Sequence, residues 1–171
     1  MTDQLPDVAA FEALFASHGA RMKSVACNML GNRNDAEDAV QEALLKAFRQ
    51  RHSFRRGAQL WTWVFRILLN TCYDMGRRRT VRGIEEAFDE TAPLPGVHTD
   101  YAIRFQLRRA LAGLTPIYRE VFLLCEVEGY THREAGEILD IPEGTSKGRL
   151  FEARRRLQLA LRGPNVSKVT S

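Results

Sequence analysis

Basic side chains spaced along residues 131–161 are the residues best suited to do chemistry in this chain. Apolar residues at positions 150, 153, 157 and 161 recur at helical spacing and should face inward. The cations would then lie on the remaining surface, where they can bind DNA phosphates or reach base edges in the major groove. These cations are Lys147, Arg149, Arg154, Arg155 and Arg156. The pattern favours a duplex-binding helix, and a solvated amphipathic hairpin is the alternative.

Two short helices and a tight turn must position these cations. Thr131 followed by Glu134 predicts a capping box at the start of the first helix. Ile138 and Leu139 continue a short apolar stripe. The sequence Asp140–Pro142 should end that helix, because the residue before a proline is disfavoured in helical geometry. A new helix can begin at once, so the segment predicts a helix-turn-helix.

Cations with interleaved aromatic residues occupy a second stretch, residues 49–79. Phe54 lies among several of these cations, and Trp61 and Trp63 follow closely. Cations can hold phosphates while exposed aromatic rings stack on unpaired bases, so the stretch suits single-stranded nucleic acid. Trp63 is expected in the core, whereas Trp61 fits either the core or a contact. The polar members of the stretch include Arg55, Arg56, Arg66, Asn70, Arg77 and Arg78.

Helical periodicity and acidic runs organise the N-terminal part. A long helix is expected from Val8 to Leu30, and Gly31-Asn32 should end it. Asn34 is expected to cap the next helix, whose segment 35–42 holds four acids and no base. A third helix, residues 60–77, is apolar almost all round and should pack on more than one side.

The composition changes after this helix. Residues 82–100 are acidic and hold two prolines, which predicts a flexible linker. Helices at 101–111 and 117–128 should precede the helix-turn-helix, with Thr115 as an N-cap and Gly129 ending the second. The predicted fold is all-α: two small helical domains, residues 1–81 and 101–163, joined by a flexible linker, with a disordered tail at 164–171.

Several function classes are not expected. The 171 residues carry a modest net charge of +4. Cys27, Cys72 and Cys125 lie far apart, which predicts reduced, mostly buried thiols in a cytosolic protein. No signal peptide and no apolar run long enough to cross a bilayer are visible. No nucleophile–base pair, phosphate-binding loop or metal-ligand cluster stands out, so we expect neither an enzyme nor a cofactor or metal. His132 is expected to face solvent.

Four segments, taken in order, resemble bacterial sigma factors of the extracytoplasmic-function (ECF) group. They are DAEDAVQEALLKAFRQ (35–50), QLWTWVFRILLNTCYDMGRRR (59–79), LTPIYREVFLLCEVEGYTHREAGEILDIPEGTSKGRL (114–150) and FEARRRL (151–157). The resemblance implies a cytoplasmic transcription factor whose partners are core RNA polymerase and promoter DNA. It also implies control by an anti-sigma factor, without membrane insertion.

The same resemblance implies roles for individual residues. Docking on the clamp helices of the largest polymerase subunit would use Asp35, Asp38, Gln41 and Glu42. Binding and opening of the −10 element would use Phe54, Arg55, Arg56, Trp61, Arg66, Asn70, Arg77 and Arg78. Reading of the −35 duplex would use Thr145, Ser146, Lys147, Arg149, Arg154 and Arg155. The helix with Phe122 and Leu123 would help this domain rest on the flap of the second large subunit, or would simply form core.

Some positions depart from the family pattern. Ser146 replaces a small aliphatic residue that usually faces the core, and Gly148 replaces a usual serine. A glycine inside a helix destabilises it by roughly 0.5–1 kcal/mol relative to alanine. Two other classes stay open: a stand-alone helix-turn-helix regulator that never contacts polymerase, and a sigma-mimicking module that sequesters an inhibitor.

Overall fold

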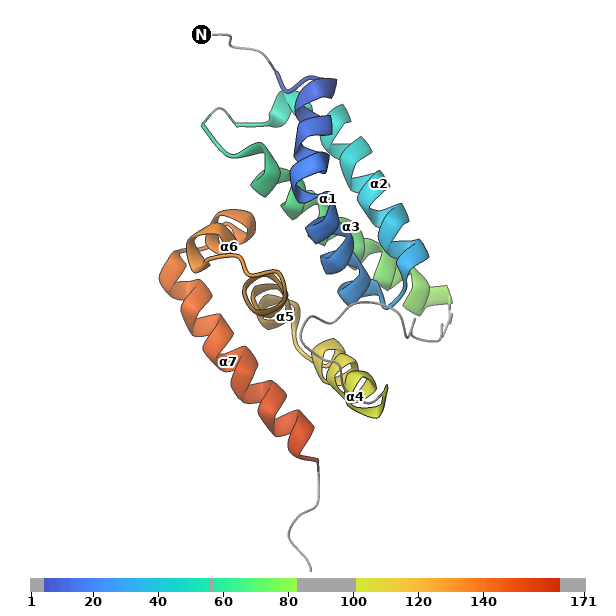
Figure 1. Ribbon diagram of the computed structural model, residues 1–171, viewed down its shortest axis with the longest axis vertical. Helices are drawn as coiled ribbons and strands as arrows, with labels where there is room; N and C mark the ends of the chain where they lie inside the picture. The colour runs from blue at the N-terminus through green and yellow to red at the C-terminus, as the bar shows by residue number, and fades with distance from the viewer. Residues whose placement is uncertain (1–4, 56, 83–100, 164–171) are drawn as a thin grey trace, which may run out of the picture. The chain divides into compact units, whose positions relative to one another are not determined.

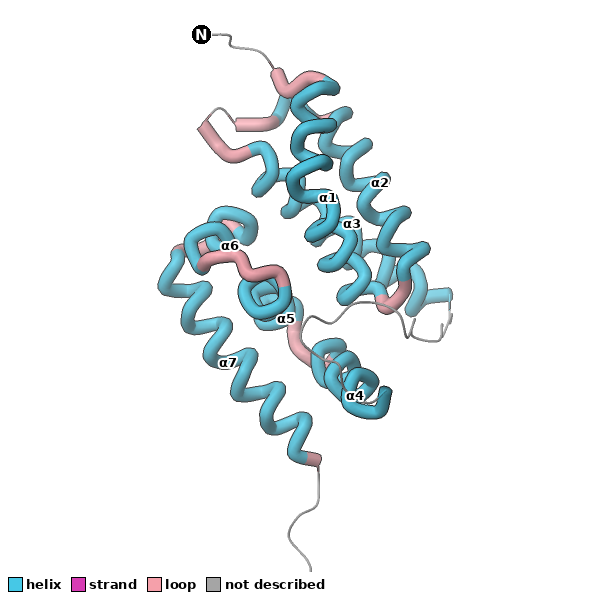
Figure 2. Tube along the Cα trace, viewed as in Figure 1, coloured by secondary structure: helices cyan, strands magenta, loops and turns pink. Residues whose placement is uncertain are grey.

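In the computed structural model, the described part of the chain consists of helices joined by short turns and loops (Figures 1 and 2). The structure describes residues 5–55, 57–82 and 101–163, and it contains no β-strand within these ranges. The prediction of an all-α fold is confirmed. The α-helices are α1 (Val8–Leu30), α2 (Arg33–Arg49), α3 (Leu60–Arg82), α4 (Tyr101–Ala112), α5 (Pro116–Phe122), α6 (His132–Leu139) and α7 (Glu143–Arg162). A 3₁₀ turn covers Arg51–Ser53, and a π-helical turn covers Leu123–Val127.

The corner between α1 and α2 is built from side-chain caps. Gly31 ends α1 in the left-handed conformation, with φ of 84°, and donates its backbone N–H to the Cys27 carbonyl at 2.8 Å. Asn32 then caps α2, since its Oδ1 accepts the Asp35 N–H at 2.8 Å. The prediction that Asn34 caps this helix was wrong, because the chain is already extended at Asn32 and enters the helix directly after it.

Helices α1, α2 and α3 pack against one another and form the first unit (Figure 1). Alanines on α2 allow its backbone to approach the larger side chains of the other two helices. Phe65, in α3, is the largest fully buried side chain among the described residues. The other residues with 0 % exposure in this core include Met22, Val25, Ala26, Ala39, Ala43, Ala47, Val64 and Leu68.

The second unit contains α4, α5, α7 and residues 132–136 of α6, and within it α7 packs against α4 and α5. Thr115 is the N-cap of α5 and Pro116 occupies its first turn, as the sequence predicted. The predicted helix 117–128 is α-helical only to Phe122 and continues as the π-helical turn. A left-handed Gly129, with φ of 71°, follows it. The core cluster of this unit consists of Leu111, Leu114, Ala153 and Leu157.

The helix-turn-helix is formed by α6 and α7. The capping box is confirmed: Glu134 N–H donates to Thr131 Oγ1 at 3.2 Å, and Thr131 N–H donates to a Glu134 carboxylate oxygen at 2.8 Å. The turn between the helices is closed by Asp140, with φ of 56°, and by a bond of 3.0 Å from Ile141 N–H to the Gly136 carbonyl. A Cβ at Gly136 would lie 2.6 Å from the Ile141 carbonyl oxygen, so this close approach requires glycine.

The expected linker at 82–100 and the expected tail at 164–171 lie outside the described residues, apart from the last residue of α3. That helix continues to Arg82, beyond the predicted end near residue 77. Among the described helices, none combines the length and apolar character that crossing a membrane requires.

Candidate nucleic-acid and protein interfaces

Helix α7 has one buried face and one open face. Ser146, Leu150, Ala153 and Leu157 are buried at intervals of four, three and four residues. On the opposite side, at the same intervals, lie Gly144, Gly148, Phe151 and Arg155, which we call the outward face of α7. No atom outside the local helix lies within 4 Å of a Cβ built at either glycine, and Phe151 is 71 % exposed. The first two turns of this face therefore present little more than backbone.

The predicted duplex-binding residues at the start of α7 flank this face. Thr145 and Lys147 are exposed, and Arg149 is half-buried. Lys147 Nζ forms an ion pair of 2.7 Å with a Glu143 carboxylate oxygen one turn earlier. An exposed pair of this kind contributes little to stability, so the lysine can exchange it for a phosphate.

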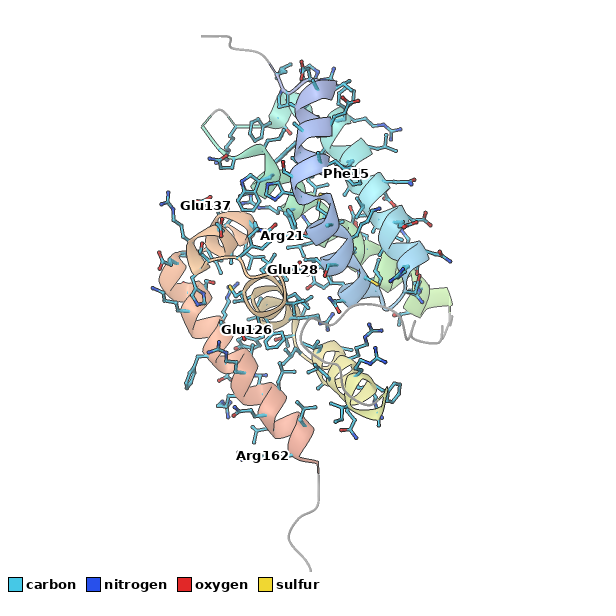
Figure 3. The ribbon with its side chains drawn as sticks, in the orientation of Figure 1. Phe15, Arg21, Glu126, Glu128, Glu137 and Arg162 are labelled. Carbon is cyan, nitrogen blue, oxygen red and sulfur yellow. The ribbon has the colours of Figure 1, made fainter. Side chains whose placement is uncertain are left out.

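The predicted cations further along α7 are also paired with acids. Arg154 pairs with Glu126, which projects from the π-helical turn and is labelled in Figure 3. Arg155 binds Glu152 in a fork, with Nε at 2.9 Å and Nη2 at 2.7 Å from the two carboxylate oxygens. Lys147, Arg154 and Arg155 of the second unit are thus all charge-compensated.

The burial of Ser146 contradicts its predicted role in DNA contact. Its side chain is 0 % exposed, and its Oγ lies 2.9 Å from Nδ1 of His132 at the start of α6. The predicted solvent-facing position of His132 was also wrong, because its half-buried ring links α6 to α7. Cys125 Sγ lies 3.7 Å from the same nitrogen, and burial raises the pKa of this thiol, which keeps it protonated. The three side chains form a small polar junction behind the outward face.

One face of α3 collects several of the residues predicted to contact single-stranded DNA. Trp63, Arg66, Asn70 and Arg77 follow at intervals of three, four and seven residues, which places them on one side of the helix. Asn70 is exposed, and Trp63 and Arg66 are half-buried. Arg77 is exposed and pairs with Asp74 on the same face. An amide, an indole and two guanidiniums can together stack on a base, read its edge and hold a phosphate.

The two tryptophans differ from the sequence-based expectation. Trp61 lies on the opposite side of α3, where its ring stacks on His18 of α1 at 4.9 Å between centroids and packs edge-on against Phe65. Trp63 lies on the Asn70 side, with its ring 5.4 Å from that of Phe54. The structure thus places Trp63 beside the predicted contact Asn70, a position that the sequence-based expectation of a core Trp63 did not include. The interval to Asn70 could have revealed it.

The loop before α3 holds further predicted residues. Phe54 is half-buried against Trp63, and Arg55 is exposed. Arg56 lies outside the described residues. Arg78, near the end of α3, is also exposed. The loop aromatic thus packs beside the α3 face rather than standing free in solvent.

The predicted docking surface on α2 contains an apolar residue that sequence reasoning missed. Asp38 and Gln41 are exposed, and Glu42 forms an ion pair of 2.7 Å with Lys46. Leu45 lies next to them, one turn beyond Gln41 and Glu42, and is 55 % exposed. An exposed leucine inside a polar and acidic rim is the usual composition of a protein-docking surface.

Asp35 has a different environment from the other predicted docking residues. Its carboxylate accepts a hydrogen bond from Asn32 Nδ2 at 2.9 Å and lies 2.8 Å from Arg79 Nη1. The same arginine nitrogen donates to the Leu30 carbonyl at 2.9 Å. This network joins the end of α3 to the α1–α2 corner, so both Asp35 and Arg79 hold the first unit together.

Metal and thiol chemistry find little support in the described ranges. No group of three or more His, Cys, Asp or Glu side chains within them could hold a metal ion. The cysteines are free thiols, and burial raises the pKa of Cys72 to about 12. That thiol stays protonated and unreactive at neutral pH.

Comparison with known proteins gives a consistent assignment. The model of Sigma-70 region 2 matches residues 14–82, and the model of Sigma-70, region 4 matches residues 104–157. The first match runs from inside α1 to the end of α3, and the second runs from inside α4 to inside α7.

Similar proteins extend these matches over most of the chain. The ECF RNA polymerase sigma factor SigM of Mycobacterium tuberculosis is 32% identical over 154 residues, which cover 86% of this chain and 75% of SigM. SigE of Mycolicibacterium smegmatis is 30% identical over 156 residues, and the chain spans only 60% of that longer relative. The solved structure of the sigma factor RpoE in complex with the anti-sigma factor NepR, from Bartonella quintana, matches with a TM-score of 0.66 and 28% identity, covering 92% of this chain and 100% of RpoE. The chain therefore belongs to the ECF RNA polymerase sigma factors of the sigma-70 family.

Proposed function

We propose that this chain binds core RNA polymerase and directs it to promoters, reading a −35 duplex with one unit and opening the −10 element with the other. The observation that carries the proposal is the contrast between two basic helices. The α3 face combines an exposed amide with a half-buried indole, whereas the first turns of α7 present bare backbone at Gly144 and Gly148, flanked by the exposed Lys147. The first composition suits unpaired bases, and the second suits a duplex.

In the proposed opening step, the α3 face captures bases of the melted strand. Unstacking a base costs a few kcal/mol, and a surface that binds the unstacked base offsets that cost. Trp63 would stack on a base, Asn70 would hydrogen-bond its edge, and Arg66 and Arg77 would hold the backbone. Phe54, packed against Trp63, would support the indole.

In the proposed duplex-reading step, α7 lies in the major groove. Lys147 would exchange its Glu143 partner for a phosphate, and Thr145 would face a base edge. Arg149 is half-buried at the side of the helix and would contact the backbone at the groove wall. Ser146 is left out of this contact because it is fully buried.

The proposed polymerase contact is the surface of α2 made by Asp38, Gln41, Glu42 and Leu45. Acidic side chains would steer it toward a basic partner, and the exposed leucine would supply apolar contact. For this group of proteins, that partner is the pair of clamp helices in the largest subunit. The suggested flap contact finds no support from Leu123, which is 1 % exposed, or from Phe122, which packs against the core cluster.

The resulting activity is initiation of transcription by polymerase, with no reaction catalysed by this chain itself and no cofactor. It would take place in the cytoplasm, where polymerase meets the nucleoid. The likeness to RpoE, which was solved with the anti-sigma factor NepR, supports control of this chain by an inhibitor of that kind.

Run-off transcription tests the proposal. Purified chain is mixed with sigma-free core polymerase and a library of duplexes with randomised upstream sequence, and the transcripts are sequenced. We expect transcripts that share a two-part upstream motif, and none without the chain. A stand-alone regulator would instead bind a duplex unaided, and a sigma mimic would yield no transcripts. Failure of the chain to co-migrate with core polymerase would also contradict the proposal.

A further inference from the structure

Helix α7 carries an acid among its cations. Glu152 lies one turn before Arg155 and Arg156, on the side of the helix between the outward face and the buried stripe. A carboxylate at this position opposes the phosphate backbone that the surrounding cations would attract.

The geometry around Glu152 restrains both arginines. Its Oε1 accepts from Arg155 Nη2 at 2.7 Å and from Arg156 Nε at 2.8 Å, while its Oε2 accepts from Arg155 Nε at 2.9 Å. The Arg156 guanidinium also lies over the Tyr118 ring, 4.6 Å from its centroid. Two planar guanidiniums are thus held along the helix rather than extended toward a partner.

The carboxylate stays ionised under all physiological conditions. Hydrogen bonds from Arg155 and then from Arg156 lower the pKa of Glu152 to about 2. Only 23% of its side chain is exposed, because the arginines cover it. A fork of this kind fixes the direction of a guanidinium more tightly than a single contact to a lysine does.

We propose that Glu152 is a positioning residue that holds Arg155 and Arg156 back from the backbone of unrelated duplexes, and so raises the selectivity of α7 for its own site. Affinity for any sequence comes chiefly from phosphate contacts, which carry no sequence information. A cation held by an acid of the same helix contributes less to this affinity for unrelated sequences. Selectivity then arises because the complexes with duplexes of unrelated sequence are weakened.

Glu152→Gln tests the proposal in the full chain. It keeps the size of the side chain but removes the charge that holds the fork. We expect binding to a fluorescent duplex of unrelated sequence to tighten roughly three- to tenfold, and the slope of log K against log salt to steepen by about 1 for each arginine freed. Promoter-directed transcription with core polymerase should become more sensitive to unrelated competitor DNA.

Two further variants separate positioning from net charge. Glu152→Asp keeps the charge but is one methylene too short for the fork, so it should behave like Glu152→Gln; parental behaviour would mean that charge alone matters and would overturn the proposal. Glu143→Gln makes the same change of charge beside Lys147 and should alter competitor sensitivity less.

The inference rests on the proposed duplex-reading role of α7, and the two can fail separately. Transcription that starts at a shared motif, combined with unchanged background affinity and salt slope in Glu152→Gln, overturns only the inference. Absence of duplex binding by the parent chain, alone and with polymerase, overturns both. Loss of specific binding at a single base pair, without any gain on unrelated duplexes, would show that Glu152 reads a base and would also overturn it.

Discussion

Individual side chains decide whether a basic helix binds paired or unpaired DNA. On α3, the exposed amide of Asn70 is one of the few polar groups that can read a base edge. The guanidiniums proposed to act on the same side would contact phosphates, which carry no sequence information. Base recognition by the first unit should therefore depend on the amide and on the neighbouring indole far more than on the guanidiniums.

Asn70→Ala should impair promoter opening and leave polymerase binding intact. One lost hydrogen bond of about 1 kcal/mol predicts roughly a fivefold loss of open complex. Permanganate reactivity of thymines in the −10 region measures the opening, and co-migration with core polymerase measures the binding. Thr80→Ala, also exposed on α3, is the matched control and should change neither. Parental opening in Asn70→Ala would reject this assignment.

Alanine substitutions at the two tryptophans should have different effects, one mainly on stability and the other mainly on promoter opening. Trp61→Ala removes the stack on His18 and the edge contact with Phe65, and should lower the free energy of unfolding by about 2 kcal/mol. Trp63→Ala should cost less stability but reduce open complex. Thermal unfolding followed by circular dichroism, together with the permanganate assay, checks both. The reverse pattern would restore the sequence-based assignment.

Helices were well predicted by periodicity and caps, because those signals are local. The capping box of Thr131 and Glu134, the end of α1 at Gly31 and the break at Asp140 all depend on residues a few positions apart. The side of α3 that each tryptophan faces could not be predicted in this way. It depends on His18, which is remote in sequence and becomes a neighbour only when α1 packs on α3.

Alanine substitutions at two glycines of the helix-turn-helix should change the stability of the protein in opposite directions. Gly148→Ala fills open space in a helix and should stabilise the second unit by roughly 0.5–1 kcal/mol. Its methyl group would also hold the backbone away from a duplex and weaken promoter binding. The sequence predicted that Gly148 destabilises the helix, but it did not predict that this glycine lies on the outward face.

Gly136→Ala provides the contrast. Its Cβ would meet the Ile141 carbonyl oxygen at 2.6 Å, so the turn must shift, and we expect a loss of about 1–3 kcal/mol. Chemical denaturation of both variants measures these changes. Equal destabilisation by the two substitutions would contradict the assignment of Gly148 to an open surface.

Charge pairing across each unit is a property of the whole molecule that the sequence did not reveal. Runs of acids and bases suggested separate charged surfaces for separate partners. Yet Asp35 pairs with Arg79, and Glu126 pairs with Arg154, so acids and bases distant in sequence neutralise each other within a unit. Fewer cations are therefore available to bind DNA than the count of lysines and arginines in the sequence suggests.

Because each unit offers a limited surface, function should depend on their covalent connection. Two weak contacts on one polymerase reinforce each other when they are joined, and the gain in avidity can reach roughly 10²- to 10⁴-fold. A protease site inserted between Arg82 and Tyr101 tests this. Before cleavage, the inserted chain should support promoter-directed transcription. After cleavage, with both halves still present at the same concentration, transcripts should fall by at least about tenfold.

Raising the concentration of the cleaved halves should restore transcription in part, because their contacts themselves are unchanged. The uncut inserted chain, treated with inactivated protease, is the control for the insertion. Undiminished transcription after complete cleavage would mean that one unit alone carries the affinity for polymerase. Binding of each separated half to core polymerase would then identify that unit.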